Sequence, residues 1–208
     1  MNILITGGAG FIGSSIANRL IDLGHSITII DNESTGIKSN IPKKAKYYKG
    51  SINNQDDLKL IFKNSFDAVL HIAGQVSIIN SFIDPIKDLH TNTQGTLNIL
   101  HMCIKYKISR FIYASTMTLY DNNIEPPFNE KTNCSPKSYY GITKLAAESY
   151  VHATSNRSDL DFVFNVTSFR MFNVYGPNQA LDNPYQGVLG IFIGNVLSVY
   201  LKCPIKQY

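Results

Sequence analysis

The sequence predicts an α/β fold in which a doubly wound parallel sheet carries helices on both faces. Three observations lead to this prediction. Short apolar runs alternate with segments of helical periodicity over most of the 208 residues. The first run, residues 2–6, passes directly into a glycine-rich turn and a helix, and the second run ends in an acid, Asp31. Parallel strands joined by right-handed crossovers place a ligand crevice at the carboxyl ends of the strands.

The composition is that of an ordinary globular domain and gives little support to several classes of function. Hydrophobic residues make up 44% and charged residues 16%, and the net charge of +4 is spread without a basic block, so we expect no nucleic-acid partner. Three distant cysteines, Cys103, Cys134 and Cys203, fit neither a disulfide framework nor a metal site. This use of cysteine fits a reducing cytoplasm, where we expect the protein. The longest apolar stretch, residues 187–201, is short and interrupted, so we expect it to be neither a signal peptide nor a membrane span.

The first thirteen residues, MNILITGGAGFIG, predict a strand, a tight turn and the start of a helix. Gly7 lets the backbone turn sharply, Gly10 leaves room for a pyrophosphate, and Gly13 lets the helix pack closely on the sheet. Backbone N–H groups and the positive end of the helix dipole then face the phosphates. A glycine-rich turn of some other α/β protein is the alternative, and the helix is expected over residues 12–23.

The acid at the end of the second strand favours a dinucleotide and selects its type. Residues 26–30 form this strand, and Asp31 follows about 20 residues after the glycines, where a carboxylate can accept both hydroxyls of the adenosine ribose. A 2'-phosphate would be repelled there. The sequence therefore favours NAD over NADP.

The remaining elements follow the same alternation. Proline is tolerated in the first turn of a helix, so Pro85 marks a helix start. The expected elements, in order, are a surface loop over 43–49 that leads into a short edge strand, a buried strand over 67–72, a long helix over 86–106, a strand over 110–115, a helix over 140–155 and a last strand over 162–170.

The segment TGGAGFIG resembles the opening of the extended short-chain dehydrogenase/reductase family, and the chain resembles its NAD-dependent nucleotide-sugar epimerase/dehydratase group. This resemblance covers nearly the whole chain and implies a Rossmann-type fold. In the family, the loop at 31–36 wraps the adenosine ribose, although a solvated turn is the alternative. The family's Gly-Asp-Ile, whose acid holds the adenine amino group, reads Gly50-Ser51-Ile52 here.

The segment HIAGQVS, residues 71–77, resembles the family loop that passes under the pyrophosphate and the nicotinamide ribose. Ala73 and Gly74 are small enough to permit that approach. His71 is a candidate for catalysis, but a histidine at a strand end is more often a hydrogen-bonded structural residue, which we favour. Asn92 begins the family's N-x-x-G-T arrangement within the long helix.

Tyr140 and Lys144 are four residues apart and share one face of a helix. A Tyr-x-x-x-Lys pair alone is weak support, because both residue types are common in this chain, but SPKSYYGITKLAAE is similar to the family's P-x-S-x-Y-G-x-x-K-x-x-x-E. The tyrosine is expected to act as the base, with an adjacent ammonium and the positive nicotinamide favouring its phenolate. Lys144 is also expected to hold the nicotinamide ribose, and Tyr139 to point elsewhere.

The segment YASTMTLYD places Thr116 at the family's Ser/Thr position, which hydrogen-bonds the reacting sugar hydroxyl, with Ser115 just before it. A buried threonine without a catalytic role is the alternative. The 4,6-dehydratases place Asp-Glu directly after this threonine, whereas Met117 and Thr118 follow here, so elimination of water lacks its acid and base.

The segment FRMFNVYGPNQ resembles the family's R-x-F-N-V-Y-G-P, which carries substrate contacts, and Asn173 is expected on the nucleotide diphosphate. Relatives of full length continue beyond residue 208. We therefore expect an NAD-binding Rossmann domain over residues 1–176 and the beginning of a small substrate lobe over residues 177–208.

Together these patterns predict an NAD-dependent UDP-sugar 4-epimerase, with a non-catalytic NAD-binding fragment, or a dehydratase, decarboxylase or reductase of the same superfamily, as alternatives. A homodimer through the helices at 86–106 and 140–155 is also implied by the resemblance, with Leu89, Leu97, Leu100, Ala147 and Val151 as candidate contacts, unless they are buried within one subunit. The expected catalytic residues are Thr116, Tyr140 and Lys144, and the expected substrate contacts are Thr116, Met117, Thr118, Tyr140 and Asn173. The expected NAD contacts are Gly7, Gly10, Phe11, Ile12, Gly13, Asp31, Asn32, Ser34, Thr35, Gly36, Ser51, Ile52, Ile72, Ala73, Gly74, Gln75, Asn92, Ser115, Tyr140 and Lys144.

Overall fold

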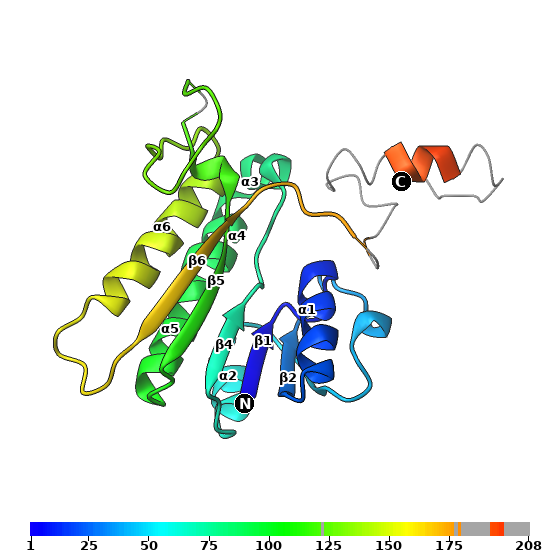
Figure 1. Ribbon diagram of the computed structural model, residues 1–208, viewed down its shortest axis with the longest axis vertical. Helices are drawn as coiled ribbons and strands as arrows, with labels where there is room; N and C mark the ends of the chain where they lie inside the picture. Colours follow the sequence, from blue (N-terminus) through cyan, green and yellow to red (C-terminus); the bar gives the residue numbers. More distant parts are fainter. Residues whose placement is uncertain (122, 177–178, 180–191, 198–208) are drawn as a thin grey trace. The chain divides into compact units, whose positions relative to one another are not determined.

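The structure is a computed structural model that describes residues 1–121, 123–176, 179 and 192–197 (Figure 1). The chain divides into two units, Met1–Met171 and Phe172–Tyr208. In the second unit, residues 192–197 are helical, and the remainder of the apolar stretch predicted over 187–201 lies outside the described residues. No helix in the described part of the chain is long and apolar enough to cross a membrane.

The first unit contains a six-stranded sheet in the order β3-β2-β1-β4-β5-β6, and every neighbouring pair is parallel. From β1 the chain moves outward through β2 to β3, then returns to the centre at β4 and moves outward again in the other direction. The strand order thus reverses between β1 and β4, which is where such sheets bind ligands. This topology confirms the predicted Rossmann-type fold. The strands are β1 (Asn2–Thr6), β2 (Ser26–Asp31), β3 (Lys46–Lys49), β4 (Ala68–His71), β5 (Arg110–Thr116) and β6 (Asn165–Met171).

Two apolar clusters pack the helices against opposite faces of the sheet, because successive side chains of a strand point to opposite sides. On β1, Leu4 joins the cluster that contains α2, α5 and α6, whereas Ile3 and Ile5 join the cluster with Ala17 of α1. Figure 1 shows α5 and α6 beside β5 and α1 beside β2. The helices are α1 (Phe11–Asp22), α2 (Gln55–Ile61), α3 (Ile78–Ile83), α4 (Pro85–Leu89), α5 (Gly95–Lys105) and α6 (Tyr139–Ser155), with short 3₁₀ turns η1 (Lys38–Asn40) and η3 (Met117–Leu119).

The long helix predicted over 86–106 is interrupted by a π-helical turn, η2 (His90–Gln94). The backbone stays in the right-handed helical region on both sides, at His90 and at Gly95, so the chain continues in the same direction from α4 to α5. A π-turn adds a residue to one turn of a helix and is often found at functional sites. Here it directs Asn92 and Thr93 inward, where both are buried.

Two further predictions need correction. The last strand begins at Asn165 rather than at residue 162. At this first residue of the strand, Asn165 N–H donates to the carbonyl of Ser109 at 2.8 Å. Three of the five candidate dimer contacts are core residues of the first unit and cannot contact a second copy: Leu100, Ala147 and Val151.

Candidate functional site

The turn between β1 and α1 is built from backbone that passes too close to other backbone for side chains. Gly7 has φ of 73°, and a Cβ there would lie 2.7 Å from the nitrogen of Ala73. A Cβ on Gly13 would lie 2.3 Å from the carbonyl oxygen of Gly7, so the absence of a side chain there lets α1 approach the backbone at the end of β1. Gly8 contacts β2, since a Cβ on Gly8 would lie 2.6 Å from the side chain of Ile29.

The N-terminus of α1 is available to an anion. Gly10 occupies the N-cap position and provides no side-chain cap, and the first turn contains no acidic residue. A Cβ on Gly10 would meet only the carbonyl oxygen of Gly7, at 3.3 Å. Uncapped N–H groups and the helix dipole favour phosphate at such a position. The predicted contacts Phe11 and Ile12 lie in this first turn.

Asp31 ties the glycine turn to the end of β2. Its Oδ2 accepts a hydrogen bond from Ala9 N–H at 2.9 Å, and its Oδ1 accepts one from Glu33 N–H at 2.7 Å. Each carboxylate oxygen keeps further acceptor capacity, which suits ribose hydroxyls. The loop after Asp31 is also hydrogen-bonded to the glycine turn, since Ile37 N–H donates to the carbonyl of Ala9 at 3.0 Å. Asn32, Ser34, Thr35 and Gly36 belong to this loop.

The segment after β3 is bound by a carboxylate on α2, that of Asp57, which we did not predict from the sequence. Ser51 N–H donates to Oδ2 of Asp57, on α2, at 2.8 Å, and Ser51 Oγ accepts from Asn53 N–H at 3.2 Å. Ile52 is buried, and the absence of a side chain on Gly95 makes room for it, because a Cβ there would lie 2.4 Å from Ile52 Cδ1. Thus the acid that the family carries at position 51 is absent, and Asp57 approaches the same segment from a neighbouring helix.

His71 is a hydrogen-bonded core residue at the end of β4, as we favoured. Its Nδ1 lies 2.7 Å from Thr6 Oγ1 and its Nε2 lies 3.0 Å from Thr96 Oγ1. Burial lowers the pKa of His71 to about 3, so the ring is neutral at physiological pH. Thr6 Oγ1 also accepts from Ala73 N–H at 3.2 Å, which positions the loop that starts at Ile72.

That loop is held against η2 by a reciprocal pair of hydrogen bonds. Gln75 N–H donates to Asn92 Oδ1 at 2.8 Å, and Asn92 Nδ2 donates to the carbonyl of Gln75 at 3.0 Å. A Cβ on Gly74 would lie 3.0 Å from Asn92 Oδ1 and 3.9 Å from Lys144 Nζ. The structure therefore brings the loop, Asn92 and Lys144 together.

The three predicted catalytic residues are all buried where β5 ends and α6 begins. Thr116, Tyr140 and Lys144 are 7%, 8% and 6% exposed, whereas Tyr139 is 47% exposed and contacts the ring of Phe82. Lys144 Nζ donates to the carbonyl of Ala114 at 2.6 Å and lies 4.2 Å from the centre of the Tyr113 ring. Of the two adjacent tyrosines, only Tyr140 faces this site.

The electrostatics of the site differ from our expectation for Tyr140. Burial raises the pKa of its phenol, and the hydrogen bond with Thr116 lowers it by less. The Lys144 ammonium, which we expected to lower this pKa, is directed to Ala114 and Tyr113. Burial lowers the pKa of Lys144 to about 7, although Glu148 and Asp88 act in the opposite sense.

Ser115 contacts an ion pair between the buried Glu148 and the half-buried Arg170, which we did not predict as part of the site. Its hydroxyl donates to Glu148 Oε2, and Glu148 Oε1 accepts from Arg170 Nη2 at 2.7 Å and Nε at 3.0 Å. Glu148 and Arg170 both lie in segments that resemble family motifs, SPKSYYGITKLAAE and FRMFNVYGPNQ, so this pair could have been found from the sequence. Met117 and Thr118 form part of η3, and Thr118 N–H donates to Thr116 Oγ1 at 3.2 Å. Asn173 belongs to the second unit, and its substrate contact stays a prediction.

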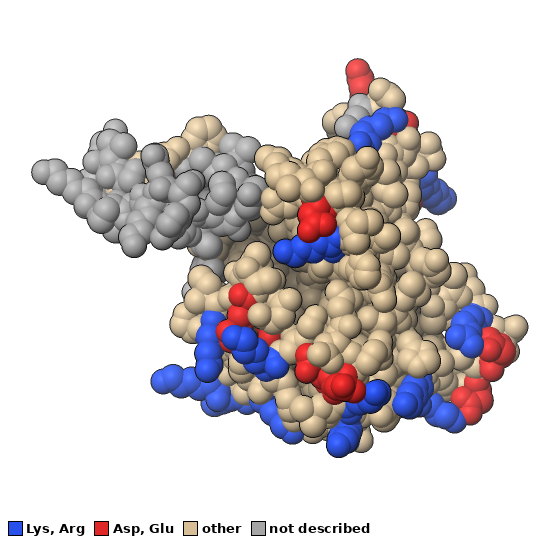
Figure 2. Space-filling model, turned by 180° about the vertical axis from the view of Figure 1, so that it is seen from behind, with Lys and Arg blue, Asp and Glu red and all other residues tan. Residues whose placement is uncertain are grey.

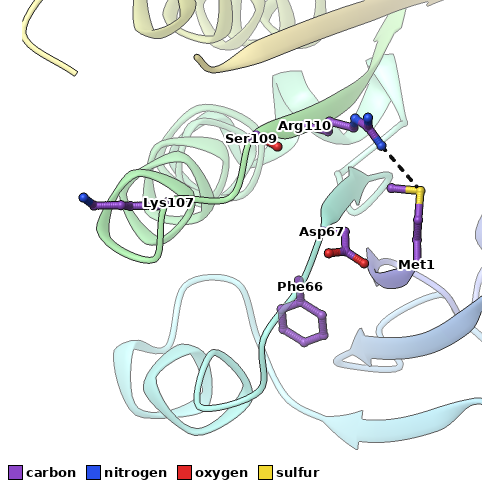
Figure 3. A pocket seen from close by; sticks show the side chains of 6 residues that line it. All are labelled: Met1, Phe66, Asp67, Lys107, Ser109 and Arg110. Carbon is purple, nitrogen blue, oxygen red and sulfur yellow. Dashed lines mark hydrogen bonds between the residues drawn. The ribbon is translucent and has the colours of Figure 1, made fainter. Parts of the chain in front are cut away.

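A hollow of about 460 Å³ lies at the amino ends of β1, β4 and β5 and is not part of this site, which lies at the carboxyl ends of the strands (Figure 3). Arg110 Nη1 approaches the sulfur of Met1 there at 3.5 Å. The residues that line the hollow are Met1, Phe66, Asp67, Lys107, Ser109 and Arg110.

In the described part of the chain, no group of three or more His, Cys, Asp or Glu could hold a metal ion. Figure 2 shows basic and acidic side chains next to one another at several places on one face of the molecule.

A model of the NAD dependent epimerase/dehydratase family matches residues 3–206. The chain belongs to this family. NAD is therefore its cofactor, and the open helix N-terminus beside Asp31 fits a dinucleotide of this kind.

Solved structures and a curated relative show the same similarity. UDP-glucose 4-epimerase from Thermotoga maritima, solved with UDP-glucose, has a TM-score of 0.86 and 36% identity over 92% of this chain and 62% of that protein. UDP-glucose 4-epimerase from Thermus thermophilus, solved with NAD, has a TM-score of 0.81 and 32% identity over 93% of this chain and 60% of that protein. UDP-N-acetyl-alpha-D-glucosaminuronate decarboxylase from Bacillus cytotoxicus is 35% identical over 95% of this chain and 63% of its own length. The chain thus spans 60–63% of these relatives.

Proposed function

We propose that this chain provides the cofactor-binding and proton-transfer part of a UDP-sugar 4-epimerase. The observation that carries the proposal is the common burial of Thr116, Tyr140 and Lys144 beside the loop at 72–75. Two of the relatives described above are UDP-glucose 4-epimerases, which supports a UDP-sugar as the substrate.

Each of the three side chains has a distinct task in the proposed reaction. NAD, when bound, would supply reversible hydride transfer at C4 of the sugar. Tyr140 Oη takes the proton of the C4 hydroxyl, and Thr116 Oγ1 orients that hydroxyl through a hydrogen bond. Lys144 holds the nicotinamide ribose and adds positive charge near the phenol. Since burial raises the pKa of Tyr140, its phenolate depends on this charge and on that of the nicotinamide.

Two alternatives remain open. A decarboxylase or reductase of the same family is supported by the relative from Bacillus cytotoxicus. Dehydration is less favoured, because Met117 and Thr118 occupy the positions that need an acid and a base. A non-catalytic NAD-binding chain is the second alternative, since the match covers only part of each relative.

We further propose a homodimer and a cytoplasmic location. Apolar side chains are exposed along α3, α4 and α6, including Phe82, Ile86 and Leu89, and such a surface fits a second copy of the chain. Cys103 and Cys134 are free thiols, as is usual in a reducing compartment.

The proposed reaction is tested by following UDP-glucose labelled with 13C by NMR after NAD is added to the 208-residue chain. We expect UDP-galactose to form. Tyr140→Phe is expected to reduce the rate by about 10²-fold or more. Tyr139→Phe, one residue away and exposed, is the matched control and should leave the rate unchanged. Equal rates in the two variants would exclude Tyr140 as the base.

A further inference from the structure

Asp88 is a fully buried carboxylate that no predicted motif includes. It lies on α4 and has no exposed surface. Its Oδ1 accepts hydrogen bonds from Gln75 Nε2 at 2.6 Å and Asn92 Nδ2 at 3.1 Å, and its Oδ2 accepts one from Thr143 Oγ1 at 2.5 Å. All three partners are neutral, so these contacts leave the negative charge of Asp88 uncompensated.

The three partners of Asp88 belong to three different parts of the site. Gln75 lies in the loop that starts at Ile72, and Asn92 lies in the π-helical turn η2. Thr143 is on α6 between Tyr140 and Lys144, and its Oγ1 also lies 3.1 Å from the carbonyl oxygen of Tyr140. One carboxylate thus holds the loop, η2 and α6 in register.

A count of the buried charges links Asp88 to Lys144. Glu148 and Asp31 are buried as well, but Arg170 binds Glu148 directly, and Asp31 accepts from the N–H groups of Ala9 and Glu33 in the glycine turn and its loop. Lys144 donates to the carbonyl of Ala114 and has no carboxylate among its hydrogen-bond partners in the described part of the chain. Asp88 likewise has no cationic hydrogen-bond partner among those residues. A buried charge without compensation is costly, so Asp88 and Lys144 stabilise each other across the polar side chains between them.

The other titratable groups that face Lys144 do not replace this interaction. His71 on β4 is neutral, because burial lowers its pKa to about 3. Tyr113 on β5 presents its ring to the ammonium, and burial raises its phenol pKa. Burial also raises the pKa of Tyr140 on α6. Glu148 and Asp88 are the two groups whose charge raises the pKa of Lys144.

We propose that Asp88 is a positioning residue: its negative charge, together with that of Glu148, favours the protonated form of Lys144, and its hydrogen bonds hold the loop at 72–75 against α6. Its effect on the protonation of Lys144 is a property of the chain itself. Its effect on catalysis rests on the proposed function, in which Lys144 must be an ammonium to hold the nicotinamide ribose.

Asp88→Asn separates the charge from the hydrogen bonds. An asparagine can accept from Gln75 and Asn92 through its oxygen and donate to Thr143 through its amide nitrogen. Thr143 can then donate to the carbonyl of Tyr140, so the packing is preserved and one negative charge is lost. Asp84→Asn is the matched control, because Asp84 caps the same helix with an exposed side chain that accepts from Lys87 N–H.

The measurement is an NMR titration of the whole chain carrying lysine labelled with 13C at Cε. The resonance of Lys144 is assigned by its loss in Lys144→Arg. We expect its midpoint to fall by about one pH unit in Asp88→Asn and to stay in place in Asp84→Asn. An unchanged midpoint in a folded Asp88→Asn protein would overturn the proposal.

A second readout joins the charge to cofactor binding. The dissociation constant of NAD, measured by calorimetry over a range of pH, is expected to rise on the alkaline side, and this rise should begin about one unit lower in Asp88→Asn. A midpoint shift without any change in this profile would overturn the part that concerns Lys144 and NAD. Neither readout depends on epimerisation, so a failure of the proposed reaction in the Tyr140→Phe experiment is distinguishable from a failure here.

Discussion

Two regions of the first unit form the site by different physical means. The glycine-turn region, residues 2–36, contributes backbone in close contact, uncapped helical N–H groups and the carboxylate of Asp31. The Tyr140 region, made of the loop at 72–75, α4, η2, β5 and α6, consists of buried polar side chains, including Lys144 and Asp88. Backbone geometry provides a general site for a dinucleotide. Buried side chains provide groups that can move a proton.

The two regions should therefore respond differently to change. A side chain added to the glycine-turn region collides with neighbouring backbone and occupies the space of the ligand, which is a steric effect. A change in the Tyr140 region alters protonation in a place of low dielectric, which is an effect of pH and charge. Mutations in the glycine-turn region should thus leave the effects of pH unaltered, and mutations in the Tyr140 region should leave the close backbone contacts of the turn unaltered.

The largest expected effect on NAD affinity is that of Gly13→Ala. A Cβ there would lie 2.3 Å from the carbonyl oxygen of Gly7, so the turn must move, and we expect NAD affinity to fall more than tenfold and stability to fall by about 1–3 kcal/mol. Calorimetry and denaturant unfolding measure the two effects. Gly24→Ala is the control: its φ of 84° makes alanine unfavourable, by about 1–2 kcal/mol, but the new Cβ meets no atom within 4 Å. Equal NAD affinity in the two variants would contradict the steric explanation.

The next effect concerns the pH dependence of stability in the Tyr140 region. Burial lowers the pKa of Lys144 from 10.5 to about 7, so between these values the unfolded chain binds a proton that the native protein lacks. The free energy of unfolding should therefore rise with pH above about 7, by up to about 1.4 kcal/mol per unit. Urea unfolding at pH values between these limits, with Lys144→Met as the comparison, measures it. A variant with the same slope as the natural chain would show that Lys144 is not responsible.

The sequence predicted the glycine-turn region better than the Tyr140 region. Glycine spacing and an acid after the second strand are local patterns, so the turn and Asp31 could be located without the fold, although the close contact of Gly8 with Ile29 was missed. Asp88 and Thr143 are 55 residues apart, and no local pattern predicts that such residues hydrogen-bond. The rise in the pKa of Tyr140 was missed for the same reason, since it depends on burial by distant elements.

The exposed helices provide the smallest expected effect. The resemblance implied a dimer contact at Leu100, Ala147 and Val151, with burial within one subunit as the alternative, and the structure shows that these three side chains are buried in the core. Ile86, on α4, is 63% exposed. If the apolar surface of α3, α4 and α6 holds a second copy, Ile86→Asp should shift the dimer towards monomer, whereas Ile37→Asp, elsewhere on the surface, should not. Light scattering at tens of micromolar protein measures this, and a monomeric natural chain would refute the dimer.

The most direct test of the division between the two regions is a calorimetric titration of the 208-residue chain with NAD and, separately, with NADP. Because the glycine-turn region is complete in the first unit and ends in Asp31, we expect one NAD to bind per chain and NADP to bind at least tenfold more weakly. Asp31→Ala should reduce that difference. Failure to bind NAD, or binding of NADP as tightly as NAD, would contradict the assignment of the glycine turn and Asp31 to the cofactor.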